Sequence, residues 1–287
     1  MRTWDTIAII GVGLIGGSIG LALRERNLAR RIIGIGRRAS SLRNALAQGC
    51  ATETTTNIIE GVKEAELVVV CTPVAEIAGQ IIEAARHFPE GGIITDAGST
   101  KAQIVTDAEN ALAGHFAVRM PYVGSHPIAG SEKSGPDAAV ADLFNERVVV
   151  VTPTEASAEE VVVGVEQFWQ SLGARTIRMH PHEHDARLAR TSHLPHLVAS
   201  ALAATTPGNG DSLPLTGSGW ADTTRIAAGD PELWRQILLA NRGATLNALA
   251  DFETVLKSWR HALENMDERL LLALLEEGKR RRDAMGS

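Results

Sequence analysis

Six residues near the start of the chain have types and spacing suited to binding phosphate groups. Gly11, Gly13 and Gly16 form a G-x-G-x-x-G pattern between an apolar run and a helix-length pattern, with Leu14 and Ile15 inside it. The first glycine allows a tight turn, the second lets a pyrophosphate approach the backbone, and the third lets the helix pack on the strand. The helix N-terminus adds N–H donors and a positive dipole. The segment predicts a dinucleotide site; a glycine-rich turn of another sheet protein is the alternative.

The residues after the second expected strand indicate which dinucleotide is preferred. An enzyme that uses NAD places a carboxylate about 20 residues beyond the glycines, where it binds the ribose hydroxyls. Here Gly36 occupies that place, and cationic and hydroxyl side chains follow it: Arg37, Arg38, Ser40 and Ser41. Guanidinium and hydroxyl donors suit a 2′-phosphate. We therefore expect NADP to be preferred over NAD, unless the two arginines only cover a solvent edge.

Two later segments at expected strand ends would border the cofactor. Cys71–Thr72–Pro73 ends one strand and would flank the nicotinamide, which makes Thr72 and Pro73 cofactor-binding candidates. Asp96–Lys101, which contains Ser99, ends another strand. Ligands of doubly wound proteins bind at the carboxyl ends of the strands, so both segments are expected at the site.

A segment in the middle of the chain, Gly124–Gly135, is dense in glycine and polar residues and contains His126. An imidazole accepts protons near neutral pH. A nicotinamide-dependent enzyme needs such a base when hydride leaves the carbon of a secondary alcohol. Taken alone, a histidine before a proline is as well interpreted as a loop packing residue.

Five of the nine histidines lie between His180 and His196. A zinc site needs three or four converging ligands, and the cluster also contains Asp185. Because the cluster straddles an expected domain junction, convergence is not required by the pattern. We expect no metal here, and instead a capping network at the junction together with one histidine in a pocket.

Composition excludes several classes of protein. The chain has 287 residues, of which 44% are hydrophobic and 22% charged, and a formal net charge of −6. This balance argues against nucleic-acid binding. Its apolar runs fall short of the roughly 18 residues that span a bilayer, and its first residues lack a signal-peptide pattern. A length of 287 residues is typical of about two domains. The chain has only two cysteines, Cys50 and Cys71, so it is expected to be a cytoplasmic protein.

Up to about residue 180, short β-branched runs alternate with helix-length amphipathic patterns. This alternation predicts buried parallel strands joined by crossover helices, a doubly wound α/β domain of the Rossmann type over residues 1–180. The expected strands are Thr6–Ile10, Arg31–Ile35, Leu67–Cys71, Gly92–Thr95, Val148–Thr152 and Arg175–Met179, and the expected helices are Leu14–Arg26, Ser40–Gln48, Val74–His87, Thr100–Ala113 and Ala158–Leu172.

From residue 181 to 287 the pattern is all-helical. The expected helices are Asp185–Ala204, Pro231–Ala250 and Phe252–Arg282. Pro195 interrupts the first of them. The last of them carries an apolar stripe that no sheet is expected to cover. About a hundred residues make a thin independent helical core, so we expect a homodimer; an intramolecular bundle is the alternative.

Taken together, these segments identify the chain as similar to the prephenate dehydrogenase family, which includes arogenate and cyclohexadienyl dehydrogenases. The matching stretches follow the family order: Gly11–Gly16, Asp96–Lys101, Gly124–Glu132, Ser192–His196, Asp222–Ala227 and Asp230–Trp234. The resemblance implies NAD(P)-dependent oxidative decarboxylation of a cyclohexadienol in tyrosine biosynthesis. Prephenate would give 4-hydroxyphenylpyruvate, and arogenate would give tyrosine, as the ring becomes aromatic.

The resemblance also implies roles for single residues. His126 would accept the proton of the substrate 4-hydroxyl, and Ser99 would orient both that hydroxyl and the histidine. Arg225 would pair with a substrate carboxylate. The remaining substrate-binding candidates line the pocket or its mouth: His196, Ser131, Glu132 and Trp234.

The sequence departs from the family pattern at Gly219–Asp222, where the usual basic residue is missing and tryptophan replaces phenylalanine. The missing carboxylate at Gly36 resembles arogenate-preferring members, whereas Glu132 resembles prephenate-using ones, so substrate preference stays open. Two other classes are alternatives: a dehydrogenase of the 6-phosphogluconate or imine-reducing type, and a non-catalytic dinucleotide-sensing module. Because one long helix would fill the end of the chain, we expect neither a fused mutase nor a regulatory domain.

Overall fold

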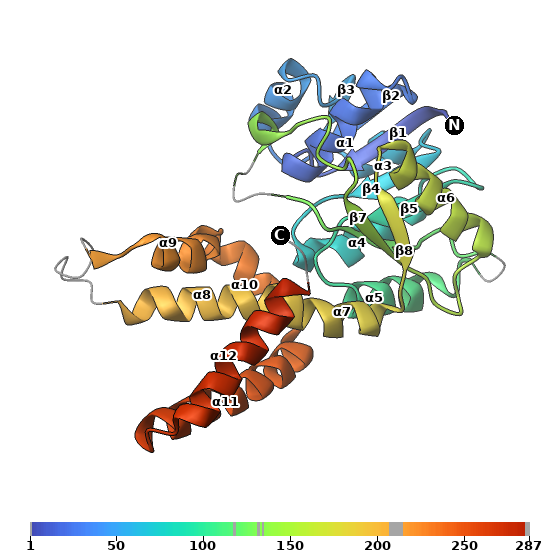
Figure 1. The fold of residues 1–287 in the computed structure, drawn as a ribbon. Helices are drawn as coiled ribbons and strands as arrows, with labels where there is room; N and C mark the ends of the chain where they lie inside the picture. Colours follow the sequence, from blue (N-terminus) through green and yellow to red (C-terminus); the bar gives the residue numbers. More distant parts are fainter. Residues whose placement is uncertain (1, 117–118, 131–132, 134, 207–214, 285–287) are drawn as a thin grey trace.

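The apolar runs of the first part of the chain form a five-stranded parallel sheet (Figure 1). The computed structural model describes residues 2–116, 119–130, 133, 135–206 and 215–284. The sheet has the order β3-β2-β1-β4-β5, and every pairing in it is parallel. Its strands are β1 (Trp4–Ile10), β2 (Ala29–Ile35), β3 (Glu53–Thr55), β4 (Leu67–Val70) and β5 (Ile93–Asp96). The expected Rossmann-type sheet is confirmed.

Helices cover both faces of this sheet, which is why its central strands are continuous apolar runs. Side chains alternate between the faces along β1: Ile7 and Ile9 join one core cluster with α1 and α6, whereas Ala8 and Ile10 join the other with α4 and α5. The helices are α1 (Leu14–Glu25), α2 (Ala39–Ala47), α3 (Ile58–Val62), α4 (Val74–Ala85), α5 (Ala102–Leu112) and α6 (Glu159–Ser171).

A second, three-stranded sheet lies beside the first and has the order β6-β7-β8, with β6 (Gly124–Pro127), β7 (Val148–Thr152) and β8 (Arg175–Arg178). Strand β7 is parallel to β8 but antiparallel to β6. A bridge between Ile94 and Tyr122 links the two sheets. The sequence analysis did not predict β6, whereas the predicted strands β7 and β8 are parallel as expected.

Strand β6 escapes sequence patterning because it has no apolar alternation of its own. The β-branched strand β7 supplies its partner, and Gly124 makes the close approach possible. A Cβ on Gly124 would lie 2.7 Å from Thr152 Oγ1, a contact too short for any side chain. His126 therefore stands on a paired strand, opposite Val150, rather than in a loop.

The helical part begins with one rod made of α7 (Pro181–Leu188), a π-helical turn (Ala189–His193) and α8 (Leu194–Thr205). The sequence predicted this helix with an interruption at Pro195. Proline has no N–H and its ring clashes with the carbonyl four residues earlier in an α-helix. The wider π turn just before Pro195 accommodates that ring without ending the rod.

The remaining helices are α9 (Ser218–Thr224), a 3-10 turn (Arg225–Ala228), α10 (Pro231–Ala240), α11 (Arg242–Glu264) and α12 (Glu268–Asp283). The predicted break near Asp251 is wrong, because α11 runs through it. The chain breaks at Asn241 and again around Met266, which has a positive φ of 49°. Asp267 then caps α12 by accepting a hydrogen bond from the Leu270 amide.

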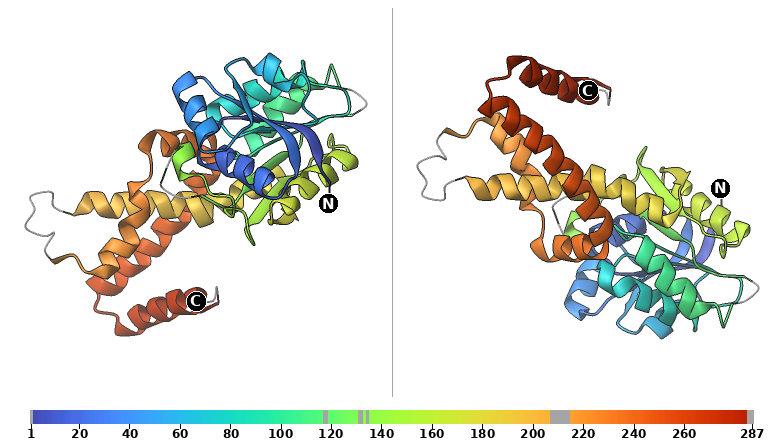
Figure 2. Two further views of the ribbon diagram at one scale, coloured as in Figure 1. Left: turned by 90° about the horizontal axis from the view of Figure 1, so that it is seen from above. Right: turned by 90° about the horizontal axis from the view of Figure 1, so that it is seen from below.

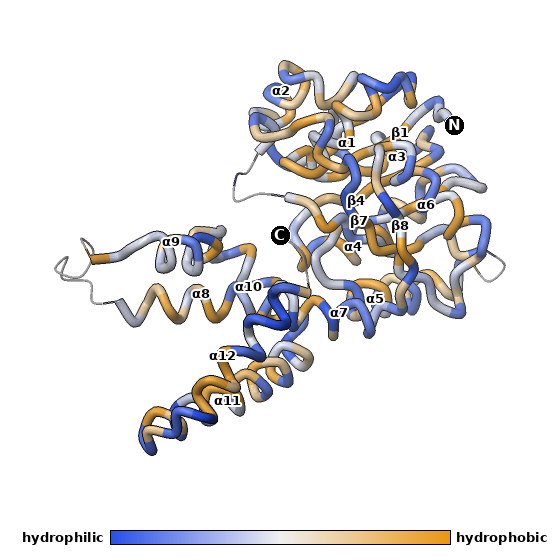
Figure 3. Tube along the Cα trace, viewed as in Figure 1, coloured by the Kyte–Doolittle hydropathy of each residue, from blue (hydrophilic) through white to orange (hydrophobic). Residues whose placement is uncertain are grey.

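Helices α11 and α12 form an arm that projects from the rest of the molecule (Figure 2). Apolar positions recur along both helices of the arm (Figure 3), and many of these side chains are exposed: Leu246, Val255, Leu256, Leu263, Leu272 and Leu275. No residue of α12 is buried. Within the described ranges, no helix is long and apolar enough to cross a membrane.

Candidate active site

The glycine turn between β1 and α1 has the geometry that the sequence predicts. Gly11 adopts a φ of +94°, which favours glycine, and its amide donates to the carbonyl of Ile35 on the neighbouring strand. A Cβ on Gly16 would lie 2.2 Å from the carbonyl oxygen of Gly11, so a glycine here is required for α1 to pack on the turn.

Gly13 differs from the other two glycines, because no contact among the described residues requires it. It precedes α1 with a negative φ of −97°, and a Cβ there would meet no described atom within 4 Å. Leu14 and Ile15 open the helix, so unpaired amides face this open space. A ligand can explain a glycine that no described contact requires. At the N-terminus of a helix, the absence of a side chain would let a pyrophosphate approach the backbone amides.

The residues expected to choose between the dinucleotides lie at the end of β2 and the start of α2. Arg37, Arg38 and Ser40 are exposed, and Ser40 and Ser41 belong to the first turn of α2. Arg37 Nη1 lies 2.9 Å from a carboxylate oxygen of Glu76 on α4. No acidic residue stands in the first turn of α2, so its amides and hydroxyls can face an anion.

Thr72 and Pro73 follow β4 and border the glycine turn between β1 and α1. A Cβ at Gly11 would lie 2.8 Å from both Cys71 O and Thr72 Cγ2, which shows how closely the two strand ends meet. Thr72 Oγ1 donates to Gln80 at 2.6 Å, and Pro73 precedes the first turn of α4. Both candidates therefore lie where the cofactor is expected.

A fully buried ion pair joins Asp96, at the end of β5, to Lys101. The same carboxylate accepts hydrogen bonds from the Gly98 amide, from Tyr122 Oη at 2.9 Å and from the Ser125 amide. Burial lowers the pKa of Lys101, and Asp96 opposes that shift. Because both charges are buried, each depends on the other for its stability.

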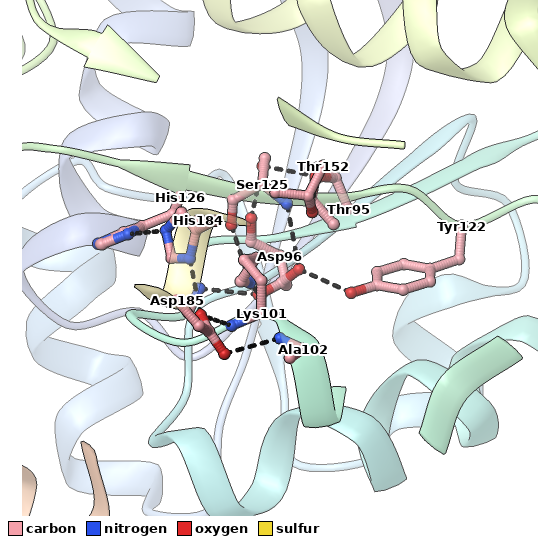
Figure 4. A network of polar contacts seen from close by, with 12 residues as sticks. Thr95, Asp96, Lys101, Ala102, Tyr122, Ser125, His126, Thr152, His184 and Asp185 are labelled. Atoms are coloured by element: carbon pink, nitrogen blue, oxygen red, sulfur yellow. Dashed lines mark hydrogen bonds and ion pairs between the residues drawn. The ribbon is translucent and has the colours of Figure 1, made fainter. Parts of the chain in front are cut away.

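Ser125 completes this buried network on the β6 side. Its Oγ donates to the carbonyl of Asp96 at 2.6 Å, accepts from Trp169 Nε1 and contacts Thr95 Oγ1, both at 2.8 Å. Its own carbonyl accepts from Lys101 Nζ at 3.0 Å. The strand that carries His126 is thus fastened to the end of β5 by polar contacts (Figure 4).

Asp185, on α7, binds the first turn of α5 from the helical part of the chain. Its carboxylate accepts the amides of Lys101 and Ala102, at 2.8 and 2.9 Å. The first N–H groups of a helix have no carbonyl partner within the helix, and no side chain at the start of α5 caps them. Burial opposes ionisation of Asp185, but the bonds from His184 and from the two amides outweigh it and hold the pKa of the carboxyl below its usual value.

His126 contacts the helical part through His184. Its Nδ1 lies 2.8 Å from His184 Nε2, and His184 Nδ1 lies 2.7 Å from Asp185 Oδ1 (Figure 4). Burial, and then the neighbours His184, Lys101 and His193, lower the pKa of His126 well below its usual value of 6.5. His126 is therefore neutral at physiological pH.

A chain of ring contacts joins His193 to His196 by way of Trp234, on α10. The ring of His196 stacks on Trp234 with centroids 3.6 Å apart, while His193 meets the same indole edge-on. Asn241 Nδ2 holds His193 Nδ1 at 3.1 Å and also donates to the carbonyl of Asp185. His196 Nδ1 is buried and has no hydrogen-bond partner among the residues that the structure describes.

The structure brings some sequence candidates together and leaves others apart. Arg225 opens the 3-10 turn after α9 and is exposed. Ser99 is half-buried in the loop between β5 and α5, and within the described part of the chain no hydrogen bond joins it to His126. Ser131 and Glu132 lie outside the described residues.

Comparison with known proteins decides between the alternatives. The family model of the prephenate dehydrogenase nucleotide-binding domain matches residues 19–178, and that of the prephenate dehydrogenase dimerization domain matches residues 180–277. The chain belongs to the prephenate dehydrogenase family. It is an oxidoreductase of that family, which excludes the 6-phosphogluconate type and the non-catalytic sensing module.

Named relatives span nearly the whole chain. It is 35% identical to the prephenate dehydrogenase of Bacillus subtilis over 98% of this chain and 76% of that one. It is 32% identical to the cyclohexadienyl dehydrogenase of Zymomonas mobilis over 99% of this chain and 97% of that one. The structure of Aquifex aeolicus prephenate dehydrogenase with hydroxyphenyl propionate and NAD+ matches with a TM-score of 0.88 and 31% identity, covering 98% of each chain.

The histidine cluster of this prephenate dehydrogenase family member divides into two pairs and His196, which stacks on Trp234. His184 and His193 take part in the junction network with Asp185, as the sequence analysis expected. His180 and His182 stack on each other instead, with ring centroids 5.6 Å apart. Among the residues the structure describes, no group of three or more His, Cys, Asp and Glu side chains could hold a metal ion.

Sequence reasoning gave no role in the site to Asn241 or Tyr122. No motif surrounds either residue, and each becomes important only because a distant segment folds against it. His184 and Asp185 were visible only as members of the cluster. A cluster at a domain junction was the one signal that pointed to them.

Replacing Lys101 by methionine should destabilise the fold, because it leaves the Asp96 carboxylate buried without its counter-charge. We expect a loss of about 3–5 kcal/mol of unfolding free energy, measured by urea denaturation. The matched control is Arg30→Met, which removes an exposed ion pair with Asp5; its unfolding midpoint should stay close to that of the wild type. Equal effects of the two variants would contradict the importance of the buried pair.

Proposed function

We propose that this family member catalyses the NAD(P)-dependent oxidative decarboxylation of prephenate, of arogenate, or of both. The observation that carries the proposal is the position of His126. A neutral histidine, with one nitrogen held by His184, stands on a strand fastened to the end of β5, and the Gly11–Gly16 turn ends the same sheet two strands away. The proposed base and the proposed dinucleotide turn would then lie at the same edge of the sheet.

Gly11, Gly13, Leu14, Ile15 and Gly16 would hold the pyrophosphate, with Thr72 and Pro73 on the nicotinamide side. When bound, the nicotinamide supplies a hydride acceptor. We propose that His126 binds the substrate 4-hydroxyl and takes its proton as hydride leaves the same ring carbon. Loss of the ring carboxylate as CO2 then makes the ring aromatic, so the protein mainly has to orient the ring and manage one proton.

Substrate binding would come from the helical part of the chain. The exposed guanidinium of Arg225 can bind a carboxylate through two parallel hydrogen bonds. His196 and Trp234 present a stacked pair, and the unpaired Nδ1 of His196 can bind a polar group of the ligand. Ser99 is proposed to orient the hydroxyl, and Ser131 and Glu132 to line the mouth of the pocket.

We further propose that NADP is preferred over NAD. The support is the arrangement of Arg37, Arg38, Ser40 and Ser41 around the first turn of α2, where a carboxylate that would repel a 2′-phosphate is missing. Arg37 forms an ion pair with Glu76. Arg38 has no carboxylate partner within the described structure, so its guanidinium is available to a phosphate.

A homodimer formed through the arm, with the chain dividing near residue 180, completes the proposal. The matching dimerization-domain model and the exposed leucines of α11 and α12 support it. A groove of about 730 Å³ on α11, lined by Leu256 and Leu263 among charged residues, offers a place for apolar side chains of a second copy. The free cysteines Cys50 and Cys71 fit the reducing cytoplasm.

An assay of prephenate and arogenate, each with NAD and NADP, tests the proposed function. His126→Asn should lower kcat by about 10²–10⁴-fold with little change in NADP affinity, because it removes the base.

Arg225→Ala should mainly raise the KM for substrate. The acid limb of kcat/KM should lie below pH 6.5, because the pKa of His126 is lowered. A wild type inactive on both substrates, or a fully active His126→Asn, would refute the proposal.

Removing both guanidinium groups tests the cofactor preference. The double variant Arg37→Ala/Arg38→Ala should lower kcat/KM for NADP by about tenfold or more, the value of one charge-assisted hydrogen bond, and leave that for NAD nearly unchanged. Arg43→Ala, an exposed arginine farther along α2, is the matched control. A wild type that prefers NAD would show that the arginines do not select the cofactor.

Charges placed in the groove should separate the subunits. The wild type should have twice the chain mass by light scattering, and Leu256→Glu/Leu263→Glu should shift it toward the monomer, because burying a carboxylate at an apolar contact is costly. Val140→Glu alters an equally exposed apolar residue outside the arm and should stay dimeric. A monomeric wild type at micromolar concentration would contradict the proposal.

A further inference from the structure

Three side chains lie in a line from the second sheet to the helical part of the chain. His126 on β6 contacts His184 on α7, and His184 contacts Asp185. We propose that His184 and Asp185 are positioning residues that determine which nitrogen of His126 carries its proton. This inference rests on the proposed function of His126 as the base.

The direction of the line is set at the Asp185 end. The amides of Lys101 and Ala102 can only donate, so both oxygens of Asp185 must accept. A carboxylate held by two main-chain donors is ionised, and it has no proton to give to His184. The hydrogen bond at 2.7 Å between His184 Nδ1 and Asp185 Oδ1 is therefore donated by the histidine.

The state of His184 follows. Its ring is fully buried, and burial lowers its pKa although Asp185 opposes that shift, so the ring is neutral. A neutral imidazole has one N–H, and in His184 that N–H is on Nδ1. Its Nε2 is then an acceptor, and the 2.8 Å contact with His126 Nδ1 must be donated by His126.

For His126 the consequence is a lone pair on Nε2. The ring is neutral and its single proton is on Nδ1, so Nε2 is the nitrogen that can accept a proton from a hydroxyl. Within the described residues, no side chain or amide occupies Nε2 by a hydrogen bond. The titratable groups whose charges act on this ring are His184, Lys101 and His193. The opposite tautomer would present an N–H to the substrate hydroxyl and could not act as a base.

The proton transfer balances in this arrangement. The O–H bond of the substrate breaks, its electron pair forms the C=O bond as hydride leaves for the nicotinamide, and the proton forms a bond to His126 Nε2. The resulting imidazolium keeps its Nδ1–H bond to His184, whose own Nδ1–H faces the Asp185 carboxylate. After CO2 leaves, the same proton can return to the phenolate oxygen.

The tautomers can be observed directly by ¹⁵N NMR of the whole protein labelled at histidine, with His126→Asn and His184→Gln used to assign the signals. In the wild type, His126 and His184 should both carry their proton on Nδ1. In Asp185→Leu, the Nδ1–H of His184 loses its acceptor, so the preference for the Nδ1–H form should be lost in both rings. An Nε2–H form of His126 in the wild type would overturn the proposal.

Kinetics of two variants at one position separate positioning from packing. His184→Gln keeps an acceptor for His126 and a donor for Asp185, whereas His184→Leu keeps neither. His184→Leu should lower kcat by about 10²–10⁴-fold with substrate KM and NADP affinity nearly unchanged, and His184→Gln should recover a large part of that loss. His182→Leu, an exposed histidine on the same helix, is the control and should behave as wild type.

The outcomes distinguish this inference from the function on which it rests. If the wild type turns over a cyclohexadienol and His184→Leu is equally active, the proposed function holds and the positioning role is wrong. Equal losses in His184→Gln and His184→Leu would also overturn it, since packing would then explain the effect. An inactive wild type would refute the proposed function, while the NMR measurement would still report the tautomers.

Discussion

The carboxylate of Asp185 is the contact on which the rest of the site depends. It is nearly fully buried, and a buried carboxylate is tolerated only where donors surround it. Its donors come from two parts of the chain: the first turn of α5, which belongs to the sheet domain, and His184 on its own helix. One side chain thus caps a helix, joins the two parts and orients the histidine next to His126. The carboxylate oxygens are shared among three donors, which restricts all of them to one geometry.

The buried ion pair of Asp96 and Lys101 has a similar function on the other side of the site. Strand β6 has little apolar surface with which to hold its place, since it consists of Gly124–Pro127. The contacts of Ser125 with Asp96, Lys101 and Trp169 replace that missing surface. Such a fully bonded polar group allows few alternative arrangements, because each shift would leave a buried donor or acceptor unpaired. The position of His126 is therefore determined by polar contacts rather than by apolar packing.

Much of the fold could be predicted from local patterns, because buried parallel strands and the G-x-G-x-x-G turn are determined by short stretches of sequence. The strands near Ile9, Ile33 and Val69 are examples, and Gly11 and Gly16 adopt the geometry expected of them. Strand β6 could not be predicted, because its partner β7 lies more than twenty residues away and supplies the apolar surface. The break at Asn241 was also missed, since its side chain contacts Asp185 and His193 from distant segments. Site chemistry was visible where a residue type is rare, as with His126, and invisible where ordinary residues meet only after folding.

Helix α12 has a consequence for the dynamics of a single chain. None of its residues is buried, and only a few side chains such as Leu270, Leu271 and Leu274 are half-buried where α12 contacts α11, so tertiary packing contributes little to its helical state in one chain alone. What remains is local: the Asp267 cap, ion pairs such as Glu277–Arg281, and three arginines in the last turn. A helix of 16 residues held by such terms is marginal in water. An uncovered α12 should therefore open more readily than the buried strands, and its amides should exchange with solvent before those of β4.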